Sequence, residues 1–150
     1  MAYDSTDDTK EHISTVRQFL ALVINDVFWR IEDHDKSKLQ EPEKSMYDEY
    51  TPKLRSMTYG SDEYKQCLKE MGVALKHHYE NNSHHPEHYP NGINGMSLLD
   101  LIEMLADWKA AGMRHADGDM QKSLEINKKR FGMSDQLAEI FQNTIKELGW

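Results

Sequence analysis

The sequence has almost no cysteine: Cys67 is the only one among 150 residues. A single cysteine excludes an intrachain disulfide, and it also excludes a zinc site built from several thiolates. Any metal site in this chain must therefore use histidine and carboxylate ligands.

Long hydrophobic runs are also missing. The best candidate, residues 19–31, is interrupted by Asn25, Asp26 and Arg30, so it does not read as a membrane-spanning segment. Residues 1–8 are acidic and lack the apolar core of a signal peptide, and we expect them to be flexible. These absences predict a cytoplasmic protein that does not associate with membranes.

An excess of basic residues is the third absence. The formal net charge of −8 argues against a protein that coats nucleic acid through general electrostatics. It leaves room for a small anionic substrate, because a bound cation and a few basic groups can reverse the sign of the charge inside one pocket. With 38% hydrophobic and 29% charged residues, the chain has the composition of a globular protein. Its length predicts a single domain over residues 1–150, and a homo-oligomer is left open.

Helical patterns dominate the chain, and no alternating stretch is long enough to indicate a strand. Ser97 and Asp100 form a capping-box-like start for one of the helices, and the segment rich in proline, glycine and asparagine at 83–95 indicates a loop. The predicted fold class is all-α. The predicted helices cover residues 9–33, a stretch after Pro42 that is interrupted near Pro52, 61–79, 97–113, 122–130 and 135–148.

Histidines are concentrated in one stretch. The segment HHYENNSHHPEHYPNG, residues 77–92, holds five of the eight histidines. Imidazole is the commonest side-chain ligand of transition metals, so the cluster raises a metal-site hypothesis. A solvated, histidine-rich loop is the competing interpretation, and matching ligands elsewhere in the chain would favour the metal.

Three other positions offer such ligands. His34 and Asp35 are adjacent where the first predicted helix ends, and His12 lies 22 residues before His34 on the same slowly drifting helical stripe. In a straight helix the two histidines would be about 33 Å apart, so they could share an ion only if the helix breaks, most readily at 25–26. Asp107 lies in an apolar helix. By position alone, Asp100, Glu103, Asp107 and Arg114 would form a solvated face with an internal ion pair.

The order of these residues resembles the HD-domain superfamily of metal-dependent phosphohydrolases. The pattern of a histidine, a His-Asp pair, further histidines and a late aspartate is matched by His12, His34–Asp35, the 78–85 cluster and Asp107. Lys38 completes a His-Asp-x-x-Lys form. This resemblance implies a compact helical bundle of about five to seven helices. It also implies that residues 9–33 form two helices or one strongly bent helix.

The chain also resembles, over most of its length, a small uncharacterised family of bacterial and phage-borne proteins. The pieces that carry this second resemblance are HDxSK at 34–38, HxxxNxHH at 78–85 with a following glutamate, and EMLxDW at 103–108. These motifs are specific, but they imply no particular reaction.

The HD resemblance implies a set of functional residues. One or two divalent ions would be bound, with manganese, iron, cobalt, nickel and zinc as candidates and magnesium as a further one. Asp107 would orient the attacking water, Lys38 would contact the phosphate, and Glu87 or His85 would protonate the leaving oxygen. The implied metal ligands are His12, His34, Asp35, His78, His85 and Asp107. The implied substrate contacts are Lys38, Asn82, His84 and Arg114.

For some of these roles, two residues are almost equally suitable candidates. His85 is only slightly preferred to His84 as a ligand, and His77 and His88 are expected to face solvent. Trp108 and Tyr89 could stack on a base, but an aromatic side chain on an apolar helix more often belongs to the core.

The favoured function is therefore hydrolysis of a small phosphorylated substrate, with a nucleotide as the default from the superfamily resemblance. A second interpretation keeps the fold but makes the protein a di-iron oxygenase that uses six such ligands. A third is a non-catalytic helical binding protein whose histidines form a structural metal site or decorate the surface.

Overall fold

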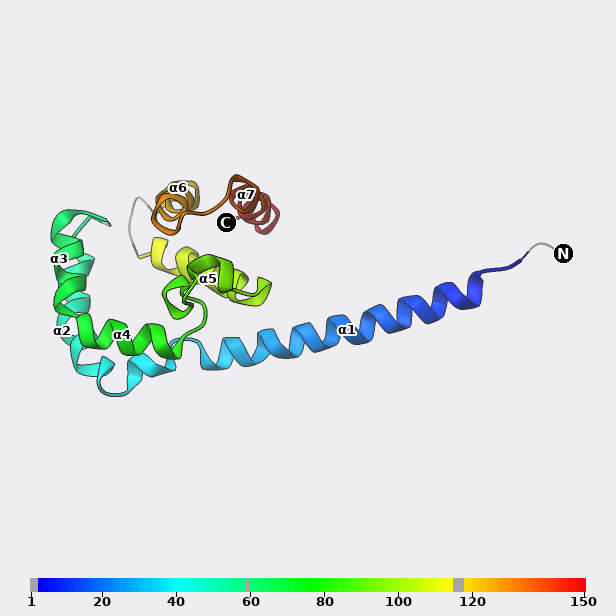
Figure 1. The fold of residues 1–150 in the computed structure, drawn as a ribbon, viewed down its shortest axis with the longest axis horizontal. Coiled ribbons are helices and arrows are strands. Elements are labelled where there is room, and N and C mark those ends of the chain that lie inside the picture. The colour runs from blue at the N-terminus through cyan, green and yellow to red at the C-terminus, as the bar shows by residue number, and fades with distance from the viewer. Residues whose placement is uncertain (1–2, 59, 115–117) are drawn as a thin grey trace. The chain divides into compact units, whose positions relative to one another are not determined.

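The computed structural model describes residues 3–58, 60–114 and 118–150 (Figure 1). Within these ranges the chain is helical and has no strand, so the all-α prediction is confirmed. The α-helices are α1 (Thr6–Asp33), α2 (Glu43–Arg55), α3 (Asp62–Glu70), α4 (Gly72–Asn81), α5 (Leu98–Gly112), α6 (Met120–Phe131) and α7 (Asp135–Leu148). The short 3-10 helices are η1 (Lys36–Leu39), η2 (Pro86–His88) and η3 (Gly92–Gly95).

The chain divides into two compact units, residues 1–34 and residues 35–150. The first unit consists of α1 and the residues before it, and the second contains all the other helices. No helix in the described part of the chain is long and apolar enough to cross a membrane.

The first unit corrects one prediction. α1 is a single helix of 28 residues, and the break expected near 25–26 is absent. The local sequence explains its continuity, because residues 6–33 contain no proline or glycine and Arg30 pairs with Asp26 one turn earlier at 2.7 Å. At 1.5 Å per residue, His12 and His34 are about 33 Å apart along this helix. They cannot share one metal ion.

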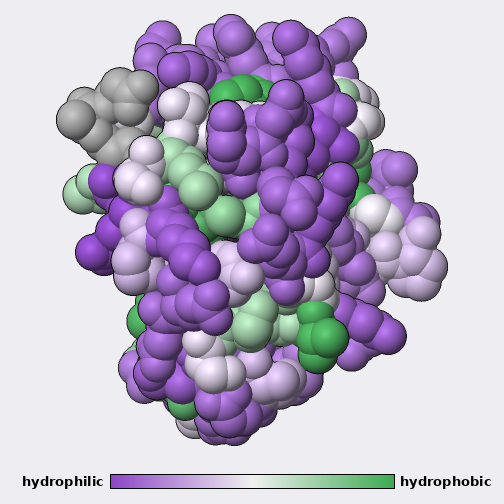
Figure 2. Space-filling view, turned by 90° about the vertical axis from the view of Figure 1, so that its left-hand side faces the viewer, coloured by the Kyte–Doolittle hydropathy of each residue, from purple (hydrophilic) through white to green (hydrophobic). Residues whose placement is uncertain are grey.

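The second unit has its main core where α5, α6 and α7 pack together. Met104 and Leu105 of α5 are buried against Phe141 and Ile145 of α7. Trp108 packs at the edge of this core, with its ring centroid 6.3 Å from that of Phe131. The core interpretation of Trp108 is therefore confirmed. A smaller core joins α2, α3 and α4 through Tyr50, Cys67 and Met71. Figure 2 shows that the face carrying α2 and α3 is covered mainly by hydrophilic residues.

Two helix boundaries differ from those predicted. The expected single helix at 61–79 is divided into α3 and α4 at Met71, which is fully buried and is followed by glycine, a poor helix former. The expected interruption at Pro52 is absent, because Pro52 lies inside the last turn of α2. A proline so near a helix end removes only one backbone hydrogen bond.

The predicted capping box at the start of α5 is confirmed, and it extends into the preceding loop. Asp100 accepts hydrogen bonds from the backbone N–H of Ser97 at 2.8 Å, from Ser83 Oγ at 2.7 Å and from the Tyr89 hydroxyl at 2.8 Å. Asp100 is only 3% exposed, so the solvated face predicted for it is wrong. Its buried carboxylate ties the loop that carries His84 and His85 to α5.

The core of the second unit makes a quantitative prediction about α5. Leu105→Ala should lower the free energy of unfolding by about 2–5 kcal/mol, because Leu105 is fully buried and its removal leaves a cavity. Leu98→Ala, on the same helix but 76% exposed, should change it by less than about 0.5 kcal/mol. Urea unfolding followed by circular dichroism measures both values, and equal effects would contradict the assigned core.

Candidate metal centre

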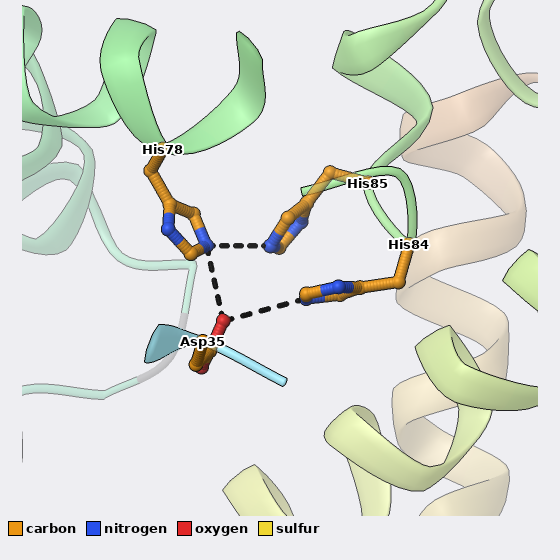
Figure 3. A group of neighbouring side chains, drawn as sticks. All are labelled: Asp35, His78, His84 and His85. Carbon is orange, nitrogen blue, oxygen red and sulfur yellow. Dashed lines mark hydrogen bonds and ion pairs between the residues drawn. The ribbon is translucent and has the colours of Figure 1, made fainter. Parts of the chain in front are cut away.

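Four side chains of the second unit converge on one point (Figure 3). One ligand atom each from Asp35, His78, His84 and His85 lies within 4.8 Å of the others. The Nε2 atom of His78 is 2.9 Å from His85 Nε2 and 3.4 Å from Asp35 Oδ1. The Nε2 atom of His84 is 3.6 Å from the same Asp35 oxygen. These residues form a group positioned to hold a metal ion.

The four side chains come from three different places in the second unit. His78 lies in the last turn of α4, and His84 and His85 follow in the loop before η2. Asp35 precedes η1 and has left-handed backbone dihedrals, with φ 58° and ψ 13°. It is the only non-glycine residue with positive φ in the described ranges. Aspartate tolerates this conformation better than most residues, and such conformations often occur at functional sites.

Carboxylates contact two of the imidazoles at Nδ1, on the side of the ring away from the other ligands. Glu43, at the start of α2, has no exposed surface, and its Oε2 lies 2.9 Å from His78 Nδ1. Glu103 Oε1, on α5, lies 3.1 Å from His84 Nδ1. An ionised carboxylate can only accept a hydrogen bond, so each Nδ1 carries the proton and each Nε2 presents its lone pair. Metal-binding histidines typically have this carboxylate partner.

Burial also favours the neutral form of His78 and His85. Desolvation, reinforced by the positive charge that His84 and His78 would carry, lowers the pKa of His85 to about 2. Burial likewise lowers the pKa of His78 below its usual value. Neutral imidazole is the form that binds a metal, so both side chains are ready ligands at neutral pH. The low pKa also makes His85 a poor proton donor, contrary to the catalytic role considered for it.

The spacing of these atoms matches that of a coordination shell. Ligand atoms bound at about 2.0–2.1 Å in a tetrahedral arrangement are about 3.4 Å apart, and neighbours in an octahedron are about 3.0 Å apart. Three of the separations in the ligand group, 2.9, 3.4 and 3.6 Å, fall around these values, and the remaining ones are all within 4.8 Å. Three imidazoles and one carboxylate are a donor set typical of first-row transition metals.

Comparison with known proteins assigns the chain to a family without assigning it a reaction. A family described as "Family of unknown function (DUF5662)" matches residues 1–147. The chain belongs to this family. No curated protein and no solved structure matches it.

Among the ligands inferred from the sequence, the structure brings together Asp35, His78 and His85. A carboxylate oxygen of Asp107 also lies within 4.8 Å of one of Asp35. His12 is exposed on α1 and cannot accompany His34 in one site. The six-ligand set of the di-iron interpretation is therefore incomplete. His34 is the C-cap of α1 and belongs to the first unit, so its ligand role stays a prediction.

Two of the residues expected to bind substrate have other roles in the structure. His84 is 1% exposed and is a member of the ligand group. Asn82 is also buried, and its amide nitrogen donates to Ser37 Oγ and to the His78 carbonyl oxygen, both at 2.8 Å. This amide joins η1 to the end of α4, which is a positioning role.

The remaining predicted residues lie at the surface. Glu87 pairs with Arg130 at 2.7 Å, so its carboxylate is engaged outside the ligand group. Arg114 is exposed beyond the end of α5, and its substrate contact stays a prediction. His88 is exposed, as expected. His77 is only half-buried, but its Nδ1 lies 2.7 Å from Glu43 Oε1, so it is not a simple solvent-facing side chain.

Sequence reasoning missed the two outer carboxylates. Glu103 lies four residues before Asp107 on the same helix face, a spacing that could have indicated a shared role. Glu43 offers no such signal, because it is an ordinary acidic residue in the first turn of a helix, 35 residues from His78.

The ligand group of Asp35, His78, His84 and His85 predicts which histidines are needed for metal binding. The purified protein should bind one Co²⁺ or Zn²⁺ with unchanged helicity, and His85→Ala should weaken this binding more than the 10–100-fold typical of losing an outer partner. His88→Ala, three residues away and exposed, should bind the metal like the unmodified chain. Isothermal titration calorimetry and elemental analysis measure both. If His88→Ala loses the metal and His85→Ala keeps it, the ligand group is wrong.

A second prediction addresses the outer carboxylates. Glu43→Gln should weaken metal affinity by about 10–100-fold, because glutamine keeps the size of the side chain but no longer fixes the proton on His78 Nδ1. Glu49→Gln is the matched control, since Glu49 lies on the same helix and pairs with Lys53 at the surface. Competition with a chelator measures the affinities. Equal affinities for the two variants would show that Glu43 does not orient the ligand.

Proposed function

We propose that this protein is a metal-dependent phosphohydrolase that acts on a small phosphorylated substrate. The observation that carries the proposal is the convergence of three imidazole Nε2 atoms and Asp35 Oδ1, with Glu43 and Glu103 holding two of the imidazoles by their far nitrogens. A nucleotide is the substrate class that the resemblance to HD-domain phosphohydrolases implies, and that part of the proposal rests on analogy.

The ligand group would hold a divalent transition metal through Asp35, His78, His84 and His85. Such an ion lowers the pKa of a bound water molecule toward neutrality and offsets the charge that develops on a phosphoryl group. An ion bound there would offer its remaining coordination positions to water and substrate. Asp107, whose carboxylate lies near that of Asp35, would orient a water molecule beside the ligand group.

The position and charge of Lys38 favour a substrate that is an anion. Its ammonium group pairs with Asp35 Oδ2, while Oδ1 of the same carboxylate faces the histidines. The Lys38 ammonium group and the histidines therefore contact opposite oxygens of the same carboxylate. From this position the positive charge of Lys38 can attract phosphate oxygens. The Lys38 side chain is 29% exposed, so solvent and substrate can reach it.

Tyr47 adds a neutral donor next to Lys38. Lys38 Nζ lies 5.1 Å from the centroid of the Tyr47 ring, and the ring makes an edge contact with His78. Burial, with Glu43 and Asp35 nearby, raises the pKa of the Tyr47 hydroxyl, which therefore stays protonated at every physiological pH. Tyr47 therefore adds no negative charge beside Lys38, which favours an anionic ligand there.

A comparison of two lysines on η1 tests the proposal. Lys38→Ala should leave metal content and melting temperature unchanged but reduce phosphate release by at least about 10-fold, because it removes a charged hydrogen bond worth about 1.5–3 kcal/mol. Lys36→Ala, an exposed neighbour on the same 3-10 helix, should keep full activity. The assay measures phosphate released from nucleotides and other phosphomonoesters by protein loaded with manganese, iron, cobalt, nickel or zinc.

The same assay separates this proposal from the non-catalytic alternative. A protein that binds its metal, gains thermal stability from it and releases no phosphate from any substrate would be a metal-stabilised binding protein. Phosphate release that is equal in the Lys38→Ala variant and the unmodified chain would show that Lys38 does not engage the substrate.

A further inference from the structure

Helix α1, considered by itself, exposes an unusual number of large apolar side chains. None of its side chains is buried within the first unit, and ten large hydrophobic side chains are at least 40% exposed. They are Ile13, Val16, Phe19, Leu20, Leu22, Val23, Ile24, Phe28, Trp29 and Ile31. Monomeric proteins rarely expose contiguous apolar patches larger than a few hundred Å².

Part of this apolar surface has a regular spacing. Ile13, Val16, Leu20, Val23 and Val27 follow one another at intervals of three, four, three and four residues. This is the heptad spacing of the a and d positions in a coiled coil, with Ile13, Leu20 and Val27 at a. We call these five residues the α1 seam. Phe19 and Ile24, at the flanking positions g and e, widen it.

The heptad spacing favours another helix as the occupant. A seam with a 3.5-residue repeat is complementary to a second seam of the same kind, because each side chain inserts between four side chains of the facing helix. A second copy of this chain necessarily carries an identical seam. Arg30 continues the heptad at a d position, and a polar residue there would help to fix the register of such a pair.

The amount of apolar surface is also that of an interface. If each of the seven side chains of the seam and its flanks contributes about 100 Å², this face of α1 presents on the order of 700 Å² of apolar surface. A stable protein–protein interface buries about 800 Å² on each partner. The face that carries the seam therefore approaches the size of one such contact.

The second unit offers no comparable stripe within the described residues. Its exposed large hydrophobic side chains are separated over η1, α4, α7 and the two ends of α5. They are Leu39, Val73, Leu98, Ile102, Met113, Ile140 and Leu148. Among these exposed residues no element carries a heptad repeat, because the apolar residues of α5 that have this spacing, such as Leu101 and Leu105, are buried. The seam therefore has its best match in another α1.

We propose that the α1 seam is a self-association surface, which pairs with the same helix of a second copy of this chain. The proposal is independent of the metal centre and of the proposed hydrolysis, because every residue of the seam lies in the first unit.

The test compares two double variants with the same charge change. Leu20→Lys with Val23→Lys places two charges in the seam, whereas Leu22→Lys with Trp29→Lys places two charges on a different side of the same helix. The added lysines reduce the net charge of −8, so dissociation cannot be attributed to greater repulsion between acidic chains. Sedimentation equilibrium on the 150-residue chain and on both variants, at about 1–100 μM, measures the mass.

The unmodified chain and the Leu22/Trp29 variant should sediment with the mass of two or more chains of 17.5 kDa, and the Leu20/Val23 variant should sediment as a monomer. Far-ultraviolet circular dichroism and the melting temperature of each variant report whether the chain is still folded. A monomeric unmodified chain overturns the proposal and indicates that α1 packs elsewhere. An associated Leu20/Val23 variant, or dissociation of both variants alike, overturns the assignment to the seam.

Discussion

The candidate site depends most directly on the contact between the buried Glu43 carboxylate and the imidazole of His78. One of the carboxylate oxygens faces His77 and the other faces His78, and the group has no exposed surface. A carboxylate in such a place must be compensated by hydrogen bonds, because leaving it unpaired would cost several kcal/mol. Compensation places the His78 proton on Nδ1, and Nε2 is then directed at Asp35 and His85. The tautomer of the ligand is thus a consequence of satisfying a buried acid.

Polar contacts organise the loop that supplies His84 and His85, in addition to the packing of Ile93 in the main core. Asp100 holds both ends of the loop through Ser83 and Ser97, and Asn82 joins its start to η1. Asp100 and Asn82 are buried and hydrogen-bonded, so displacing the loop would leave buried polar atoms without partners. Such a network restricts the loop to one conformation, and two imidazoles in a flexible loop would bind a metal far less tightly.

Asp35 belongs to the candidate metal centre and lies at the start of the second unit. It follows His34, the C-cap of α1, and the seam of α1 is the surface that we propose for self-association. The left-handed backbone of Asp35 turns the chain between α1 and η1, and its two oxygens serve different neighbours, the histidines and Lys38. The residue that would contribute the only negative charge among the four ligands is therefore also the residue at the junction of the two units.

The sequence by itself determined the helical fold class, the capping of α5, and the candidates Asp35, His78 and His85, because local periodicity, capping residues and ligand chemistry can all be recognised over a few residues. It did not determine whether 9–33 is broken. The resemblance implied a break, but a segment without proline or glycine stays helical. Only the tertiary structure decided that His84 joins His85 in the ligand group and that Glu43 lies behind His78, since these depend on contacts between residues far apart in the sequence, such as Asp35 and His84. Contacts across such separations leave no local pattern in the chain.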